Sequence, residues 1–301
     1  MKRAIITGAC GYLGSRLAKA MIDRGIMVYA FDCINEIDIR HELLKYYICD
    51  IEKNIFPIKD HLEDSDFLFH FAWNGVHSDF RNDYYRQSGN IFSLINILSI
   101  AKNLKVKKTI IPGSASEYAS STMPITGNNK PAPVDAYGAI KSSCHLISNL
   151  WSIENNLPLI WIVPSSIYGP GRNDNNILTY AIKTLLKGDK PLFTPLEQRW
   201  DYIFIDDYIE ALLLVADKGI TGKNYTIGYG AARELRDYVF IIKDIINSSL
   251  CLGIGEKPYK GKKPDNSEMD ISELINDTGF RPLVKFEDGI RRTIEWIKMN
   301  E

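Results

Sequence analysis

The sequence predicts an α/β fold in which a doubly wound parallel sheet carries a smaller C-terminal α+β lobe. Apolar runs of strand length alternate with helical segments through the first half of the chain, as in a parallel sheet that helices cover on both faces. A glycine-rich turn joins the first strand to the first helix. The alternation weakens after Gly171, which indicates a different organisation in the second half.

Length, charge and cysteine content restrict the class of protein. The chain has 301 residues, enough for one large domain or two interlocked ones, and its formal net charge is −1. This balance gives no reason to expect nucleic acid or a membrane as a partner. Five scattered cysteines without a C-x-x-C pair, and the absence of a leader or a long apolar run, favour a cytoplasmic protein without a metal site.

The periodicity assigns most elements to residue ranges. In the first half we expect strands at 4–6, 27–31, 45–49, 67–71, 108–112 and 159–163, and helices at 15–24, 90–103 and 136–155. In the second half we expect extended segments at 198–205 and 225–228, and helices at 179–187, 206–218, 235–247, 271–276 and 286–299. We expect residues 1–165 to form a dinucleotide-binding domain to which 199–228 return, and residues 166–198 and 229–301 to form the substrate lobe.

The glycine-rich turn predicts an anion site. A strand, a glycine turn and a helix N-terminus direct backbone amides and the positive helix end toward a phosphate. The spacing is G-x-x-G-x-x-G, close to the dinucleotide fingerprint, although a tight turn alone would also use glycine. The candidate cofactor contacts in this turn are Gly8, Gly11, Tyr12, Leu13 and Gly14.

Asp32 predicts which dinucleotide binds. It ends the second strand, 18 residues after Gly14, where a carboxylate accepts hydrogen bonds from both ribose hydroxyls in the adenosine half of NAD. It would repel the additional phosphate of NADP, and no arginine follows before Arg40. NAD is therefore expected rather than NADP. The alternative is that Asp32 is only a turn residue at the strand end.

Further cofactor contacts are expected where other strands end. Asp50 follows the third strand, within reach of the adenine amino group, and the small or flat residues after the fourth strand would border the pyrophosphate and the ribose. The complete set of these candidates is Asp50, Ile51, Phe71, Ala72, Trp73, Asn90 and Pro164.

Three residues predict proton transfer at a secondary alcohol. Tyr137 and Lys141 are four residues apart on one expected helix, so their side chains share a face. A nearby ammonium lowers the pKa of a phenol and can also hold the nicotinamide ribose. Ser114, at the end of the fifth strand, is placed to hold the substrate oxygen. Alone, a Tyr and Lys pair at this spacing is commonly structural; after a dinucleotide site it indicates hydride-transfer chemistry.

Together these motifs resemble the extended short-chain dehydrogenase/reductase family, also described as NAD-dependent epimerases and dehydratases, which acts on nucleotide sugars. The likeness covers nearly the whole chain and implies a Rossmann-like fold. The matching elements are Thr7-Gly8-x-x-Gly11-x-x-Gly14, His70-Phe71-Ala72-Trp73, Ser114, Tyr137-Gly138-x-x-Lys141, Tyr168-Gly169-Pro170 and Arg199-Trp200-Asp201-Tyr202-Ile203.

The resemblance also implies substrate contacts and an assembly. Ser166 matches a residue beside the sugar and Arg199 one on the diphosphate, with Asn176 as a further candidate. The alternative for Arg199 is a surface ion pair, for example with Asp201. Family members commonly form homodimers through the helices that match 90–103 and 136–155, although ordinary core packing explains those apolar stripes equally well.

Departures from the family pattern separate the possible activities. Sugar dehydratases of the family carry an Asp-Glu pair where this chain has Ala115 and Ser116, and an extended Glu117 would point to the opposite face. Dehydration is therefore not expected. The segments 113–118 and 198–202 resemble a subgroup with 4-keto-sugar reductases, so the leading hypothesis is reduction of a nucleotide-linked 4-ketohexose. The alternatives are an NAD-dependent C4 epimerase, which Asp32 favours, and a non-catalytic dinucleotide sensor.

Overall fold

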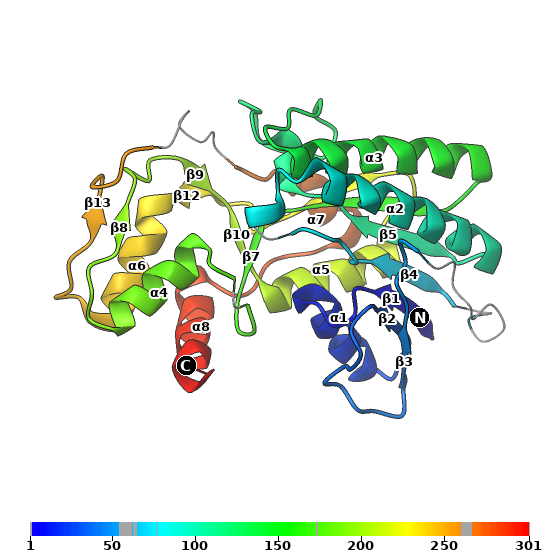
Figure 1. Cartoon of the computed structure of the whole chain (residues 1–301), viewed down its shortest axis with the longest axis horizontal. Coiled ribbons are helices and arrows are strands. Elements are labelled where there is room, and N and C mark those ends of the chain that lie inside the picture. Colours follow the sequence, from blue (N-terminus) through cyan, green and yellow to red (C-terminus); the bar gives the residue numbers. More distant parts are fainter. Residues whose placement is uncertain are drawn as a thin grey trace.

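The computed structural model describes residues 2–53, 62, 65–76, 78–172, 174–259 and 267–300. Its centre is a seven-stranded sheet with the order β11-β6-β5-β4-β1-β2-β3, and all neighbouring strands are parallel (Figure 1). The strands are β1 (Arg3–Thr7), β2 (Met27–Asp32), β3 (Leu44–Ile48), β4 (Phe67–His70), β5 (Lys108–Pro112), β6 (Leu159–Pro164) and β11 (Asn224–Ile227). The predicted α/β fold with a Rossmann-like sheet is confirmed.

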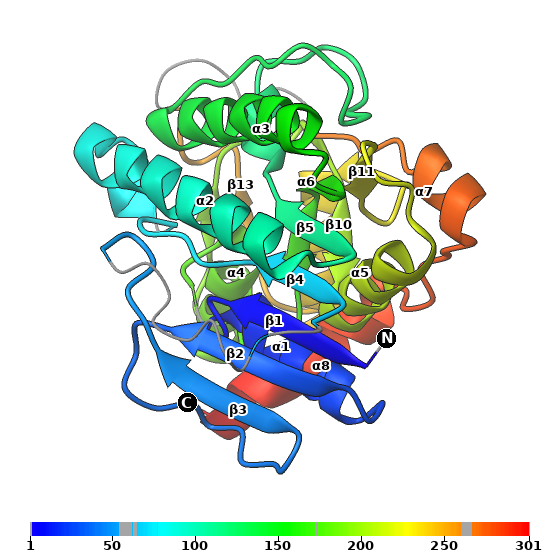
Figure 2. The ribbon, with the colours of Figure 1, turned by 90° about the vertical axis from the view of Figure 1, so that its right-hand side faces the viewer.

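Helices cover both faces of the sheet (Figure 2). One face packs against α2 (Tyr84–Leu104) and α3 (Ala136–Asn155), and the other against α1 (Tyr12–Ile22) and α5 (Ile205–Lys218). Side chains of β1 alternate between the two cores: Ile5 belongs to one hydrophobic cluster, and Ala4 and Ile6 to the other. None of the described helices is both long and apolar enough to cross a membrane.

The C-terminal lobe combines three helices with short strand pairs. The helices are α4 (Ile177–Leu186), α6 (Leu235–Asn247) and α8 (Phe286–Asn300). The pairs are β7 (Ser166–Tyr168) with β10 (Tyr202–Phe204), β9 (Arg199–Trp200) with β12 (Arg233–Glu234), and β8 (Leu192–Phe193) with β13 (Gly253–Ile254). The last described helix outside this lobe, α7 (Ser272–Thr278), packs near α5 and β11. Because α5 and β11 join the large sheet, we propose a dinucleotide domain and a substrate lobe with two changes from the predicted ranges. Helix α7, which was expected in the lobe, packs beside α5 and β11, and β9 and β10, which were expected in the dinucleotide domain, pair with strands of the lobe.

Three predicted boundaries differ most from the structure. Helix α1 begins at Tyr12 rather than residue 15, directly after Gly11, so Gly14 lies in its first turn. Helix α2 begins at Tyr84 rather than residue 90, because Asp83 caps it by accepting a hydrogen bond from the Arg86 amide, although its first turn lacks an apolar stripe. The extended segment expected at 198–205 is two strands, β9 and β10, with different partners.

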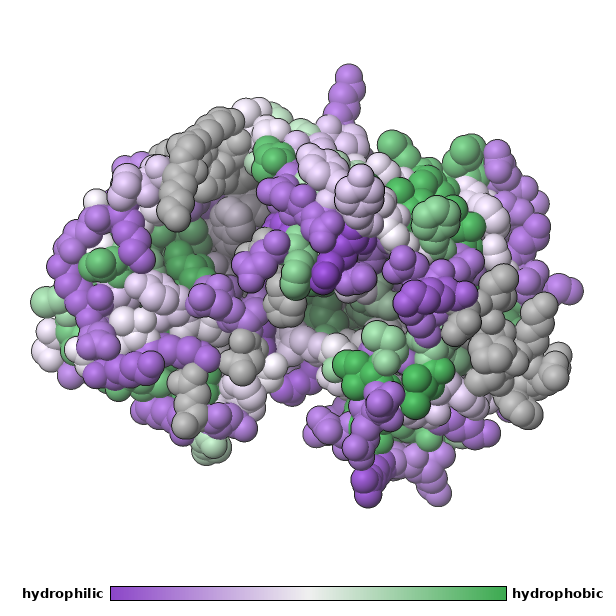
Figure 3. All heavy atoms as spheres, in the orientation of Figure 1, coloured by the Kyte–Doolittle hydropathy of each residue, from purple (hydrophilic) through white to green (hydrophobic). Residues whose placement is uncertain are grey.

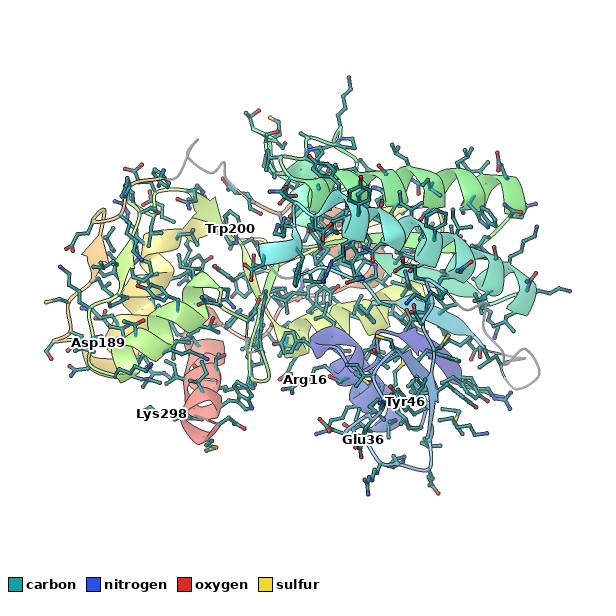
Figure 4. All side chains as sticks on the ribbon, in the orientation of Figure 1. Arg16, Glu36, Tyr46, Asp189, Trp200 and Lys298 are labelled. Carbon is teal, nitrogen blue, oxygen red and sulfur yellow. The ribbon has the colours of Figure 1, made fainter. Side chains whose placement is uncertain are left out.

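The carboxyl ends of the parallel strands face the C-terminal lobe. In Figure 1 the N-terminus, at the start of β1, lies on the side of the sheet away from that lobe. Figure 3 shows the surface hollowed between the two parts. Arg16 of α1 lies at this border (Figure 4), and its guanidinium donates to the Pro170 carbonyl at 2.6 Å. Ligands of open α/β sheets bind at this edge, which is therefore the place to examine for a site.

Candidate active site

The glycine turn forms a cradle at the N-terminus of α1. Gly8 has a φ of +69°, and a Cβ there would lie 2.6 Å from the Ala72 amide nitrogen. A Cβ on Gly14 would lie 2.1 Å from the Gly8 carbonyl oxygen, so both glycines are required for close packing of the backbone. A Cβ on Gly11 would meet only that same oxygen, at 3.2 Å. The turn therefore fits the pyrophosphate of a dinucleotide, which the N-terminus of α1 would hold.

Asp32 connects the glycine turn to the end of β2. Its Oδ2 accepts a hydrogen bond from the Cys10 amide at 2.9 Å, and its Oδ1 accepts one from the Cys33 amide at 2.8 Å. Tyr46 and Glu36 lie nearby (Figure 4), with the Cys10 thiol 3.4 Å from the Tyr46 hydroxyl. The turn role of Asp32 is thus visible in the structure, and its contact with a ribose stays a prediction.

Several other predicted cofactor residues have structural partners. The Asn90 side chain accepts from the Asn74 amide at 2.7 Å and donates to the Asn74 carbonyl at 3.0 Å, so it fixes the loop after β4. Asp50 accepts from the Glu52 amide at 3.1 Å and pairs with Lys53. Four further candidates lie partly or fully buried near the sheet edge, and their cofactor contacts stay predictions: Leu13, Ile51, Phe71 and Pro164.

Tyr12 points away from the turn. Its hydroxyl would lie 3.1 Å from a Cβ on Gly169, in the loop after β7, and it is buried with no hydrogen-bond partner among the described residues. Burial raises the pKa of Tyr12. Only its backbone therefore remains a candidate for the cofactor, while its ring forms part of the contact between the sheet and the lobe.

The structure brings the three predicted catalytic residues to one place. Ser114 follows β5, and its hydroxyl accepts a hydrogen bond from the Ser116 amide at 3.1 Å. Tyr137 is in the first turn of α3, which Asp135 caps by accepting from the Gly138 amide at 2.8 Å. The Ser114 side chain is close enough to the Tyr137 phenol to lower its pKa. This pair is positioned to hold one oxygen atom of a substrate and to exchange a proton with it.

Lys141 is buried one helical turn beyond Tyr137. Its Nζ donates to the Pro112 carbonyl at 2.9 Å and lies 3.6 Å from the centroid of the Trp73 ring. Desolvation lowers the pKa of Lys141 to about 8. Trp73 also meets Tyr137 edge to face, with ring centroids 5.7 Å apart, so one indole contacts both the phenol and the ammonium.

Replacing Lys141 by Met is expected to stabilise the cofactor-free fold at neutral pH while abolishing activity. The folded pKa of about 8 is below the ordinary value of a lysine, so folding at pH 7 includes the full cost of burying the cation. After allowance for the lost hydrogen bond, the gain should be about 1–2 kcal/mol, and it should disappear as the pH rises from about 8 to about 10. Urea unfolding of both proteins at pH 7 and at about pH 10 measures this difference in stability. Equal or lower stability of Lys141→Met at pH 7 would contradict this account.

The phenol of Tyr137 is subject to opposing influences. Burial raises its pKa, whereas the Ser114 side chain and the positive charge of Arg81 lower it. The Arg81 guanidinium carbon lies 4.4 Å from the centroid of the Tyr137 ring. Sequence reasoning did not identify this residue, because one arginine in a polar and aromatic segment matches no motif and its contact with Tyr137 spans 56 positions that only the fold brings together.

Glu117 is part of a buried network and does not reach the substrate side. The segment after Ser114 is a 3-10 helix, η2 (Ala115–Tyr118), and not the extended chain assumed above. As its third residue, Glu117 closes a capping box by accepting from the Ser114 amide at 2.7 Å. It also accepts from the Trp161 indole at 3.3 Å and pairs with His145 Nδ1 at 3.1 Å, and it is fully buried. Glu117 therefore supports Ser114 and cannot replace the missing dehydratase pair.

Two of the predicted substrate residues lie next to Trp200 in the C-terminal lobe. Ser166, in β7, accepts a hydrogen bond from the indole of Trp200 at 2.8 Å, and Figure 4 places Trp200 at the edge of the lobe. Arg199 is exposed and pairs with Glu268 at 3.2 Å. The pairing with Asp201 suggested above is wrong, because both carboxylate oxygens of Asp201 accept backbone amides inside the protein.

Asn176 has a structural role. It caps α4, where its side-chain oxygen accepts from the Leu178 amide at 2.9 Å and the Thr179 amide at 3.1 Å. Its amide group donates to Asp174 at 2.7 Å. With both ends engaged, Asn176 is a weaker substrate candidate than Ser166 and Arg199.

Comparison with known proteins decides the family. The model of the NAD dependent epimerase/dehydratase family matches residues 4–228, which contain the glycine turn, Ser114, Tyr137 and Lys141. The chain belongs to this family. The match confirms the resemblance inferred from the motifs, but it does not extend to the reductase subgroup.

Several proteins with known names align with almost the whole chain. Protein CapI of Staphylococcus aureus is 24% identical over 335 residues, covering 98% of both chains. The UDP-N-acetylglucosamine 4-epimerase of Methanobrevibacter ruminantium superposes with a TM-score of 0.89 at 23% identity, covering 100% of this chain and 99% of that one. The UDP-glucuronic acid 4-epimerase of Bacillus cereus, solved with UDP-glucuronic acid and NAD, gives 0.86 at 21%, covering 99% and 100%. These structures share the fold.

Proposed function

We propose that this protein is an NAD-dependent enzyme that oxidises and reduces C4 of a nucleotide-linked sugar. The observation that carries the proposal is that Ser114 and Tyr137 lie together, with Lys141 one turn away, at the strand edge that also presents the glycine turn. Asp32 at the end of β2 supports NAD over NADP.

Each side chain has a separate role in the proposed reaction at C4. Tyr137 takes the proton of the sugar hydroxyl as the carbonyl forms and returns it in the reverse step. Ser114 holds the same oxygen, and its own hydroxyl is oriented by the Ser116 amide. Bound NAD supplies the redox chemistry, since its nicotinamide accepts and donates hydride. Lys141 would hold the nicotinamide ribose, and Ser166 would lie beside the sugar. Arg199 would leave its ion pair with Glu268 and bind the diphosphate of the substrate instead.

Among the possible outcomes at C4, we propose epimerisation. The absence of an acid–base pair at Ala115 and Ser116, together with the burial of Glu117, is unfavourable to dehydration. Two structural neighbours are 4-epimerases of UDP sugars, which supports the same class here. Reduction of a 4-keto sugar is the second candidate and rests on the sequence likeness of segments 113–118 and 198–202 to reductases. A sensor without catalysis is disfavoured because Tyr137 and Lys141 are both present.

Two assays separate these functions: one without added cofactor, and one with nucleotide-linked 4-keto sugars and added NADH. The purified enzyme is incubated with UDP-, dTDP- and CDP-linked hexoses and hexuronic acids, and the products are analysed by NMR. Epimerisation predicts an equilibrium of two C4 epimers with no net consumption of nicotinamide. Turnover only of 4-keto sugars, with stoichiometric loss of NADH, would favour the reductase. No conversion in either assay would contradict the proposed function.

We further propose a homodimer in the cytoplasm, formed through the outer faces of α2 and α3. These helices lie side by side in Figure 2 and expose large apolar side chains: Phe92, Leu146, Leu150 and Ile153, each more than half exposed. On α3 these are spaced by four and three residues, so they form one stripe. Such a patch on a monomer is typical of an interaction surface.

Leu150→Glu is expected to convert the dimer to a monomer. A charge in the centre of an apolar interface is left without a partner and costs several kcal/mol. Light scattering coupled to gel filtration gives the mass. Leu283→Glu is the matched control, because Leu283 is 83% exposed outside these helices and its replacement should leave the dimer intact. A monomeric wild-type protein would contradict the dimer.

A further inference from the structure

Arg81 lies on the face of the Tyr137 ring. Its guanidinium carbon is 4.4 Å from the ring centroid. Two hydrogen bonds fix the Arg81 guanidinium: its Nε donates to Asp135 Oδ2 at 2.7 Å, and its Nη2 donates to Ser116 Oγ at 2.8 Å. The side chain is 31% exposed, so the cation is held in place but remains partly hydrated.

The backbone of the same segment holds the start of α3 independently. The Tyr137 amide donates to the Arg81 carbonyl at 2.9 Å, and the Ala136 amide donates to Asn82 Oδ1 at 3.1 Å. These are amides that a helix start leaves without an intrahelical partner. Because the carbonyl belongs to the main chain, a substitution of the Arg81 side chain leaves this docking contact in place.

Three charged groups are near enough to influence the Tyr137 phenol. Glu117 and Asp135 raise its pKa, and Arg81 lowers it. Lys141 is held instead over Trp73 and on the Pro112 carbonyl. The hydroxyl of Tyr208 is close enough for the charge of Tyr137 to act on it. Arg81 is therefore the cation in contact with the phenol ring, opposing two carboxylates.

We propose that Arg81 is a positioning residue that holds the Tyr137 ring and favours its phenolate form. A cation within about 4–6 Å of an acid lowers its pKa by about 1–3 units, with the smaller value for partly hydrated groups. The proposal rests on the role of Tyr137 given under the proposed function, but the effect on its titration is independent of any substrate.

The titration of Tyr137 tests this role directly. The ultraviolet absorbance of tyrosinate is followed against pH, and the transition that Tyr137→Phe removes is assigned to Tyr137. Arg81→Gln and Arg81→Met should each move this transition upward by about one pH unit. Arg81→Lys, which keeps the charge, should restore most of the wild-type value. The pH limb of kcat/KM that reports Tyr137 should move by the same amount, whether the phenol acts as acid or base.

Arg86→Gln is the matched control. Arg86 also stacks on a ring, with its guanidinium carbon 3.8 Å from the centroid of Phe80, and it pairs with Asp83. Phe80 cannot ionise, so this variant loses an equivalent cation–ring contact and should leave the Tyr137 transition unchanged. The proposal would be overturned if the Tyr137 transition is unshifted in Arg81→Gln or Arg81→Met, in either variant that folds. An equal shift in Arg86→Gln would also overturn it. Lack of turnover with an Arg81-dependent transition would instead refute only the proposed function.

Discussion

Replacing Tyr137 by Phe is expected to lower kcat by about a thousandfold, with little change in cofactor binding. The variant loses only the phenolic oxygen, which exchanges the proton of the sugar hydroxyl in the proposed reaction. The ring keeps its edge-to-face contact with Trp73 and its contact with the Arg81 guanidinium. The effect should therefore appear in the chemical step and not in folding or in the dissociation constant of NAD.

Tyr208→Phe provides the comparison. Tyr208 is fully buried in α5, and its hydroxyl has no hydrogen-bond partner among the residues that the structure describes. Loss of this hydroxyl should leave kcat within about twofold of wild type and stability nearly unchanged. Single-turnover kinetics and calorimetric binding of NAD measure both variants. Retention of more than about a tenth of the wild-type kcat in Tyr137→Phe would exclude the phenol as the proton-transfer group.

Glu117→Ala is expected to destabilise the protein by about 3–5 kcal/mol, the largest effect on stability of the changes considered. Removing the carboxylate leaves three buried donors without their acceptor: the Ser114 amide, the Trp161 indole and His145 Nδ1. The variant should also lose activity in its folded fraction, because the capping box that fixes Ser114 is gone.

Two further variants isolate the buried network as the cause. Glu117→Gln retains an oxygen for the Ser114 amide and should be destabilised by less than Glu117→Ala. Glu154→Ala removes an exposed carboxylate of α3 and should change stability by no more than about 0.5 kcal/mol. Urea unfolding gives all three values. A loss below about 1 kcal/mol in Glu117→Ala would show that the network contributes little.

The sheet could be predicted because its strands are buried on both faces. Continuous apolar runs such as 27–31 and 159–163 leave few alternatives, and the observed β2 and β6 differ from them by one residue. The start of α2 was missed because Tyr84 and Tyr85 are exposed and carry no periodic signal. The helix begins there on account of one cap, Asp83.

The catalytic group was predictable because its members follow local rules. Tyr137 and Lys141 share a helix face, and Ser114 ends a strand at the cofactor edge. The position of the Glu117 side chain could not be predicted, because an extended chain and a 3-10 turn direct the same side chain to different sides. The pairing of Arg199 with Glu268 and the contact of Arg81 with Tyr137 join distant segments, and no local pattern encodes them.

The fate of a deuterium label at C4 of the sugar tests the proposed reaction most directly. A nucleotide sugar that the enzyme converts is prepared with deuterium at C4 and incubated to equilibrium in ordinary water without added cofactor. The account predicts that both C4 epimers retain the label at C4, because hydrogen leaves and returns at that carbon within one turnover. Loss of the label to solvent, or epimer formation that persists in Tyr137→Phe at the wild-type rate, would contradict it.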